Sequence, residues 1–247
     1  LNFGSPEKPE IFSQLRRAIE GISAACRALE LPVTGGNVSL YNEIEGQAIY
    51  PTPIIGMLGL LEDAEAYLTA GWQQEGHIIV LFGETNQELG GTEYLSVIHG
   101  LEGGKLPQLD LDREKRVQAS VLQAAREGLL ASAHDCSEGG LAVCLAESCI
   151  ISGKGARLAV DLDMRADALL FGESQSRVVL SLAEEHLPRL QQIAAQHAVP
   201  CTVLGRVEGD ALTISLRGNT PVLLSWSVET MKEHYDHSLS RTMKGQA

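Results

Sequence analysis

Apolar positions in the first third of the chain indicate one amphipathic helix and two buried strands. Between Pro9 and Leu29 they recur at steps of three and four, which places one apolar stripe on a helix face. Pro9 suits the first helical turn, and Pro32 ends the helix. The continuous apolar runs 54–61 and 77–82 have the length that is typical of buried strands.

The rest of the chain mixes helical and strand-like patterns without a strict strand–helix–strand repeat. Helices are expected at 112–130, 141–151, 184–197 and from the last strand to about 235, and strands at 156–162, 177–182, 202–207, 211–216 and 222–226. The turn Glu208-Gly209-Asp210 carries a hairpin signal. We therefore predict an α+β (mixed α/β) fold with a mixed sheet. Residues 132–140 are expected to form a loop, and Thr92 to cap a helix.

Composition narrows the class of protein. The 247 residues are 44% apolar and carry a net charge of −13, so a broad nucleic-acid surface is not expected. No apolar run approaches the ~20 residues that a membrane span needs. The five cysteines form no CxxC pair, which favours a reducing cytoplasm over a disulfide framework. The acidic, polar stretch near 62–72 indicates a domain boundary.

One short segment combines groups suited to a nucleotide. Gly35 and Gly36 let the backbone approach a ligand closely, and their N–H groups can bind an anion. Asn37 and Glu43 offer oxygens to a hard cation such as Mg²⁺, and Ser39 offers a hydroxyl to a substrate. The alternative is a Gly-Gly turn followed by a surface loop.

A second dense segment is His134-Asp135-Cys136-Ser137-Glu138-Gly139-Gly140. Asp135 and Glu138 could hold a metal, and the glycine pair could meet a phosphate where a helix begins. Alternatively, Ser137 caps that helix and the glycines allow close packing. A nucleophilic pair of Cys136 and His134 is disfavoured because no third group orients it. Glu173, in a turn before a strand, is a further candidate carboxylate. P-loop and Rossmann motifs are absent from the sequence.

Taken together, six segments resemble the phosphoribosylformylglycinamidine synthase family, within the AIR-synthetase-like superfamily. In chain order they are LNFGSPEKPE (1–10), GGNVSLYNE (35–43), TPIIGM (52–57), LGGTEY (89–94), HDCSEGGL (134–141) and FGES (171–174). The resemblance covers nearly the whole chain. It implies an N-terminal AIR-synthetase-like α/β domain at 1–62 and a C-terminal α+β domain at 63–247.

The resemblance also implies a reaction and its residues. Formylglycinamide ribonucleotide, ATP and glutamine-derived ammonia would give the formylglycinamidine ribonucleotide through a phosphorylated amide. By motif position, Gly36 would contact ATP, Asn37 would bind Mg²⁺ and Ser39 would contact the ribonucleotide. Gly35, Glu43, Asp135, Ser137, Gly139, Gly140 and Glu173 would be phosphate or metal neighbours. Expected partners are a glutaminase subunit and a small accessory subunit.

The family pattern is incomplete in these residues. Members contain two tandem halves, and this chain matches the second, so the expected catalytic histidine lies in the half that is not seen here. We expect the chain to be inactive alone and to dimerise or aggregate through its N-terminal domain, whose sheet edge lacks its partner. The competing interpretations are another superfamily enzyme, such as AIR synthetase or selenophosphate synthetase, and a non-catalytic scaffold that binds nucleotide.

Overall fold

The computed structural model describes residues 1–161, 164–218 and 221–245, and the chain divides into two compact units. We call Leu1–Ala66 the N-terminal unit and Tyr67–Ala247 the C-terminal unit. In the described part of the chain, no helix has both the length and the apolar character of a membrane span.

The N-terminal unit is built on one long helix. Helix α1 (Pro9–Ala28) confirms the predicted amphipathic helix, although Ile11, at 7% exposure, is its only buried residue. The short strands β1 (Glu43–Ile44) and β2 (Gln47–Ala48) form an antiparallel hairpin. Asn2 bridges to both Ser39 and Thr52, which holds the first residues of the chain against the middle of the unit.

The buried strand predicted at 54–61 is wrong. These residues form no strand, and their apolar side chains are exposed, with Leu58 fully exposed and Leu60 91% exposed. A strand needs a hydrogen-bonding neighbour, and the N-terminal unit supplies only the two-residue strands β1 and β2, which pair with each other. The N-terminal unit by itself therefore does not cover these apolar side chains.

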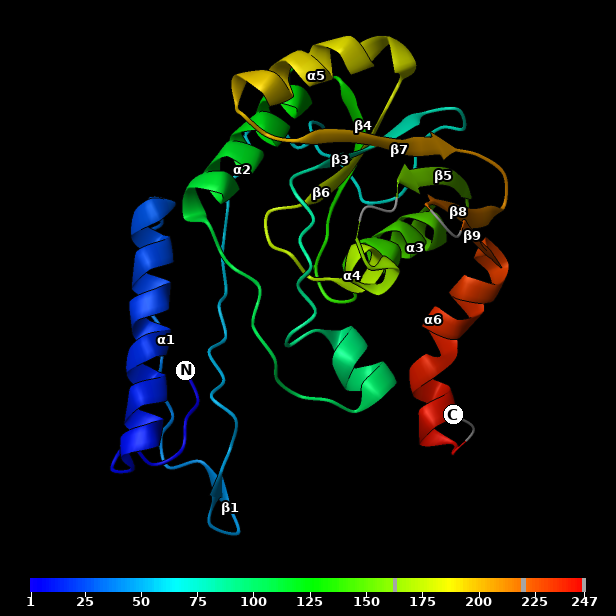
Figure 1. Ribbon diagram of the computed structural model, residues 1–247. Helices are drawn as coiled ribbons and strands as arrows, with labels where there is room; N and C mark the ends of the chain where they lie inside the picture. The colour runs from blue at the N-terminus through cyan, green and yellow to red at the C-terminus, as the bar shows by residue number, and fades with distance from the viewer. Residues whose placement is uncertain (162–163, 219–220, 246–247) are drawn as a thin grey trace. The chain divides into compact units, whose positions relative to one another are not determined.

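The C-terminal unit contains a seven-stranded mixed sheet in the order β4-β6-β3-β7-β5-β8-β9 (Figure 1). Its strands are β3 (Ile78–Phe82), β4 (Leu130–Asp135), β5 (Ala156–Asp161), β6 (Val178–Leu182), β7 (Cys201–Val207), β8 (Ala211–Arg217) and β9 (Val222–Ser227). All pairs are antiparallel except β5 with β8, which is parallel. The predicted mixed sheet and α+β class are confirmed.

Helices cover both faces of this sheet. They are α2 (Leu111–Arg126), α3 (Gly140–Ser152), α4 (Ala166–Phe171), α5 (Leu187–Gln196) and α6 (Val228–Met243), with a π-helix η1 (Tyr94–Ile98) and a 3₁₀ turn η2 (Glu184–His186). Alternate residues of β3 point to opposite faces: Val80 packs toward α2 and α5, and Ile79 packs toward α3 and α4. Both faces of β3 are buried, which is why its sequence is a continuous apolar run.

Three further expectations need correction. The strands β7 and β8 do not form a hairpin, because β5 lies between them in the sheet and pairs with both. Residues 130–135 form strand β4, so the first part of the predicted loop, 132–135, belongs to an edge strand. The last helix, α6, continues to Met243 rather than ending near 235. Leu162, predicted to end the strand β5, lies outside the described residues.

Candidate functional site

The glycine pair at 35–36 lies in an exposed, irregular stretch of the N-terminal unit. Neither glycine has a left-handed φ, and a Cβ at either position would meet nothing within 4 Å. Nothing within the N-terminal unit therefore requires glycine at these two positions. The space beside this backbone is open, as an incoming ligand or partner needs.

Ser39 is held in place by Asn42, a residue that the motif analysis did not single out. Asn42 Nδ2 donates to the carbonyls of Phe3 and Ser39, each at 3.0 Å. The Ser39 hydroxyl donates to Asn42 Oδ1 at 3.2 Å. The position of Asn42 shortly after Ser39 was the sequence signal that could have identified it, because Asn side chains commonly hydrogen-bond to nearby backbone groups in turns. Asn37 is exposed beside this anchored turn.

Glu43 is paired within the same unit. Lys8 Nζ lies 2.6 Å from Glu43 Oε1, and this hydrogen bond lowers the pKa of the Glu43 carboxyl. The carboxylate is ionised at neutral pH but already forms an ion pair with Lys8. Asn37 is therefore better placed than Glu43 to offer a side-chain oxygen to a metal ion.

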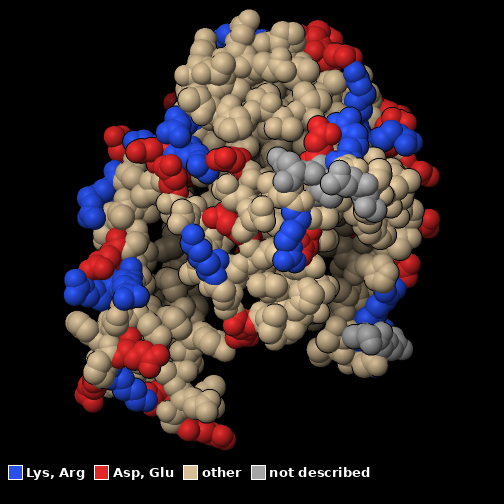
Figure 2. Space-filling model, in the orientation of Figure 1, with Lys and Arg blue, Asp and Glu red and all other residues tan. Residues whose placement is uncertain are grey.

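The C-terminal unit has a cleft of about 670 Å³ where the C-terminal end of β4 meets the start of β6. It is lined by Leu109, Glu114, Val117, Gln118, Val121, Leu122, Asp135, Cys136, Ser137, Glu138, Glu173, Gln175, Ser176, Arg177 and Val178. The structure thus brings the candidates Asp135, Ser137 and Glu173 to one cleft. On the face drawn in Figure 2, basic and acidic side chains are interspersed.

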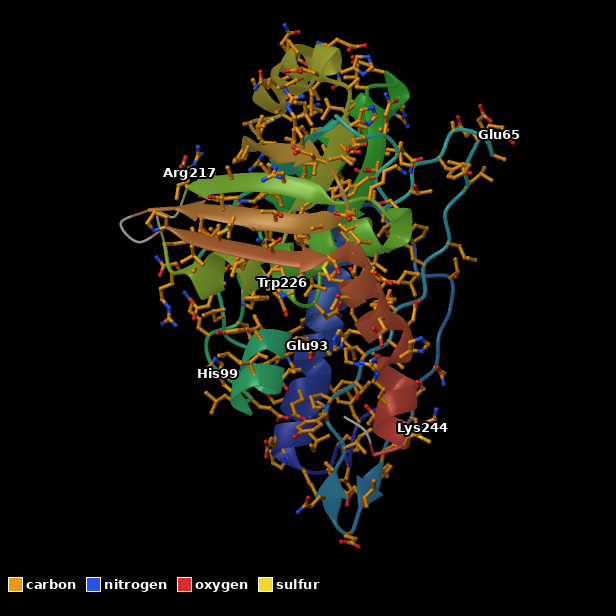
Figure 3. The ribbon with its side chains drawn as sticks, turned by 90° about the vertical axis from the view of Figure 1, so that its right-hand side faces the viewer. Glu65, Glu93, His99, Arg217, Trp226 and Lys244 are labelled. Atoms are coloured by element: carbon orange, nitrogen blue, oxygen red, sulfur yellow. The ribbon has the colours of Figure 1, made fainter. Side chains whose placement is uncertain are left out.

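Glu173 ties two loops of the C-terminal unit together. Its Oε1 accepts hydrogen bonds from the backbone N–H groups of Gly139 at 2.8 Å and Glu93 at 2.9 Å. Figure 3 shows Glu93 at the start of η1 and His99 at its other end. The carboxylate therefore joins the η1 segment to the turn that precedes α3.

Gly139 and Gly140 both adopt left-handed φ values, +78° and +67°. A Cβ on Gly140 would lie 2.5 Å from the carbonyl oxygen of Gly172, and a Cβ on Gly139 would lie 2.4 Å from Val143 Cγ2. Packing alone thus requires glycine at position 140. The capping role considered for Ser137 is wrong: α3 has no side-chain cap, and the Ser137 hydroxyl donates to Asp135 instead.

Asp135 and His134 are engaged locally. The Ser137 hydroxyl is the main cause that lowers the pKa of Asp135, with His134 adding to it. His134 Nε2 lies 3.1 Å from Glu147 Oε2, so the ring is directed at carboxylates rather than at Cys136. Among the described residues, no group of three or more His, Cys, Asp or Glu side chains is placed to hold a metal.

Arg177 is a buried cation that the sequence interpretation overlooked. Only 2% of the residue is exposed, and its guanidinium donates to the carbonyls of Ser174 at 2.9 Å and Gly172 at 2.6 Å and to Thr85 Oγ1 at 3.1 Å. All three acceptors are uncharged, and burial lowers the pKa of the guanidinium. A cation directly before an apolar strand was the signal that could have found it.

Comparison with known proteins identifies an α+β protein of the AIR synthase type. The family "AIR synthase related protein, N-terminal domain" matches residues 1–61, and "AIR synthase related protein, C-terminal domain" matches residues 74–216. The chain belongs to this family of AIR synthase related proteins.

Two curated relatives of the chain carry the same name. The chain is 49% identical over 239 residues to "Phosphoribosylformylglycinamidine synthase subunit PurL" of Moorella thermoacetica, covering 97% of this chain and 32% of that protein. It is 46% identical over 244 residues to the subunit of the same name from Alkaliphilus metalliredigens, covering 99% and 33%. The chain thus spans about a third of the length of these relatives, and the family resemblance seen in the motifs is confirmed.

Solved structures show the same fold. "T. maritima PurL complexed with FGAR" superposes with a TM-score of 0.71 at 21% identity, over 87% of this chain and 36% of that one. "Structure of PurLQS from Thermotoga maritima" superposes with a TM-score of 0.66 at 19% identity, over 94% and 37%. At such identity the likeness establishes the architecture only.

Proposed function

We propose that this chain forms part of a phosphoribosylformylglycinamidine synthase, an ATP-dependent ligase of purine synthesis. The observation that carries the proposal is the 49% identity, over nearly the whole chain, to a subunit of that name. Solved relatives are described as complexed with ATP and with FGAR. Because the chain spans only a third of such subunits, the activity is assigned to these residues together with the remainder of such a protein.

In the proposed reaction, ATP phosphorylates the amide oxygen of formylglycinamide ribonucleotide and releases ADP. Ammonia, supplied from glutamine by a glutaminase subunit within a complex that includes a small accessory subunit, attacks the amide carbon and phosphate leaves. The chain's contribution is positioning, which is the main protein contribution in phosphoryl transfer. Open backbone at Gly35 and Gly36 faces the nucleotide, and Ser39, fixed by Asn42, meets the ribonucleotide.

The residues fit a magnesium ion held largely by phosphates. Mg²⁺ usually takes one or two protein oxygens and completes its shell with phosphate and water oxygens. Asn37 offers one exposed amide oxygen, whereas Glu43 is committed to Lys8. Bound there, the ion would neutralise phosphate charge. We assign Asp135, Ser137, Gly139, Gly140 and Glu173 to the surroundings of a phosphate and assign no metal to them.

Replacing Asn37 tests this assignment. Asn37→Ala is expected to weaken Mg-ATP binding about tenfold, ~1.4 kcal/mol, because one metal ligand is lost. Asn37→Asp, which keeps oxygen ligands, should retain the binding. Val38→Ala is the matched control, because Val38 is exposed in the same segment and carries no ligand atom. Calorimetric titration with ATP, with and without Mg²⁺, measures the effect.

The possible results test the assignment of Asn37 and the proposed function separately. Equal Mg-ATP affinity of wild type and Asn37→Ala removes Asn37 from the site. The same samples, supplied with formylglycinamide ribonucleotide and ammonia, should form no amidine, because the chain is proposed to need the rest of the protein. Turnover by the 247 residues alone contradicts that part of the proposal, and nucleotide binding without turnover in a complete protein favours the scaffold interpretation.

We also propose that the chain self-associates through residues 53–61 when it is isolated. Burying these exposed apolar side chains removes them from water, and pairing would satisfy the backbone of a segment that forms no strand. Sedimentation should show a dimer or larger species that Leu58→Glu dissociates. Val33→Glu is the control, because Val33 is a similarly exposed residue of the same unit. A stable wild-type monomer at high concentration contradicts the proposal.

A further inference from the structure

Two cysteines of the C-terminal unit pack in one apolar cluster where the cleft adjoins helix α3. Cys136 directly follows β4, is half-buried and lines the cleft. Cys144 is buried in α3, and its Sγ lies 3.8 Å from the carbonyl oxygen of His134. Cys136 packs against the apolar cluster that contains Cys144, and each of the two side chains is the largest single influence on the pKa of the other.

Local backbone geometry brings the two cysteines into the same apolar cluster. Between them the chain reverses at Gly139 and Gly140, whose left-handed φ values direct α3 back along the end of β4. The Cys136 N–H donates to the carbonyl oxygen of Arg177 at 3.0 Å, which fixes the backbone of the loop beside β6. The pair is therefore held by the fold and does not depend on a flexible segment.

We propose that Cys136 and Cys144 form a redox pair, in which a peroxide oxidises Cys136 from the cleft and the two sulfurs then join in a disulfide. The cleft gives a small oxidant access to Cys136, while Cys144 is screened by α3. The other cysteines lack this arrangement: Cys149, for example, is buried and accepts a hydrogen bond from Trp72 Nε1 at 3.3 Å. This inference is independent of the proposed synthase function.

The electrostatics assign different roles to the two sulfurs. The neighbouring Cys144 side chain is the main cause that lowers the pKa of Cys136; the buried Arg177 charge assists it, and burial and the Asp135 charge oppose it. The same contact raises the pKa of Cys144. Since the thiolate is the nucleophile, Cys136 is the attacking sulfur and Cys144 the resolving thiol.

The chemistry balances with hydrogen peroxide as the oxidant. The Cys136 thiolate attacks one peroxide oxygen, the O–O bond breaks, hydroxide leaves and the sulfur becomes a sulfenic acid. The Cys144 sulfur then attacks this sulfur, the S–S bond forms, the S–O bond breaks and water leaves with the Cys144 proton. Two thiols are oxidised by two electrons, and one peroxide is reduced to two waters.

Peptide mapping tests the pair. The protein is treated with hydrogen peroxide, its free thiols are blocked in denaturant, and a glutamate-specific protease separates residues 128–138 from 139–147. We expect the two peptides to be joined by a reducible link. Cys149→Ser should keep the link, whereas Cys136→Ser and Cys144→Ser should lose it. In Cys144→Ser, Cys136 should be trapped as a sulfenic acid by dimedone.

Comparison with unfolded protein distinguishes a cysteine pair that the fold holds together from oxidation through chance encounters. Linking should be at least about tenfold faster in folded protein than in urea, because the fold holds the two sulfurs together. Three results overturn the proposal: equal or slower linking in the folded protein, oxidation of Cys136 without linkage to Cys144, or links to another cysteine as the main product.

Discussion

Replacing Gly140 with alanine is expected to destabilise the C-terminal unit by roughly 3 kcal/mol or more, from left-handed strain of ~1–2 kcal/mol plus an overpacking cost of similar size. The φ of +67° is unfavourable for any residue with a Cβ, and the added atom would lie 2.5 Å from the Gly172 carbonyl oxygen. That neighbour is backbone, so it cannot move aside as a flexible side chain would.

Gly128 provides a matched control. Its φ is +68°, yet a Cβ there would meet nothing within 4 Å. Gly128→Ala therefore isolates the conformational cost, roughly 1 kcal/mol after the entropy that alanine removes from the unfolded chain. Urea unfolding followed by tryptophan fluorescence measures both variants, because Trp72 and Trp226, the chain's two tryptophans, lie in the C-terminal unit. Equal losses would show that contact with Gly172 is unimportant.

The sequence predicts an element correctly when its apolar pattern arises from burial against other parts of the same unit. The helix at 9–28 and the strand at 78–82 are found because their apolar spacing reflects burial within the chain. The segment 54–61 has an equally clear pattern but forms no strand, because the N-terminal unit offers no free strand for it to pair with. An apolar pattern indicates that a segment is to be buried, and it does not identify the surface that buries it.

The order of strands in the sheet is harder to predict from sequence patterns than the strands themselves. Glu208-Gly209-Asp210 does turn the chain, with Gly209 at a φ of +69°, but the strands that it joins are separated in the sheet by β5. A turn signal is local, whereas strand insertion depends on contacts far apart in sequence. The sequence did not reveal strand β4 for a related reason: its alternation of small and polar residues is weak, and its pairing with β6 decides its structure.

The sequence likewise predicted one part of the candidate site and could not predict the rest. Motif spacing pointed to Asp135, Ser137 and Glu173, which the structure places in one cleft. It could not show that Glu173 bonds two loop amides, that Asn42 fixes Ser39, or that Cys136 and Cys144 share one apolar cluster. These contacts are set by φ values and by packing across the fold, neither of which leaves a regular spacing in the sequence.

The second large effect is expected at Arg177. Arg177→Met keeps most of the side chain's length but removes its donors, leaving buried acceptors at Gly172 and Ser174 without a partner. Each such loss costs ~1–3 kcal/mol, so the unit should lose roughly 3–5 kcal/mol. Arg206→Met is the control, because that exposed arginine pairs with Glu184 at the surface and should contribute little. Urea unfolding again measures the difference.

The predicted effects at Gly140 and Arg177 involve one shared atom, so they can be tested together. The Gly172 carbonyl oxygen accepts from Arg177 Nη2 at 2.6 Å and is also the oxygen that a Cβ at position 140 would meet. Once Arg177→Met has released that carbonyl, the turn can move away from the methyl group that Gly140→Ala adds. The double variant should therefore lose less stability than the sum of the single losses, by ~1 kcal/mol. Strict additivity in the double-mutant cycle would show that the buried guanidinium does not fix the turn against helix α3.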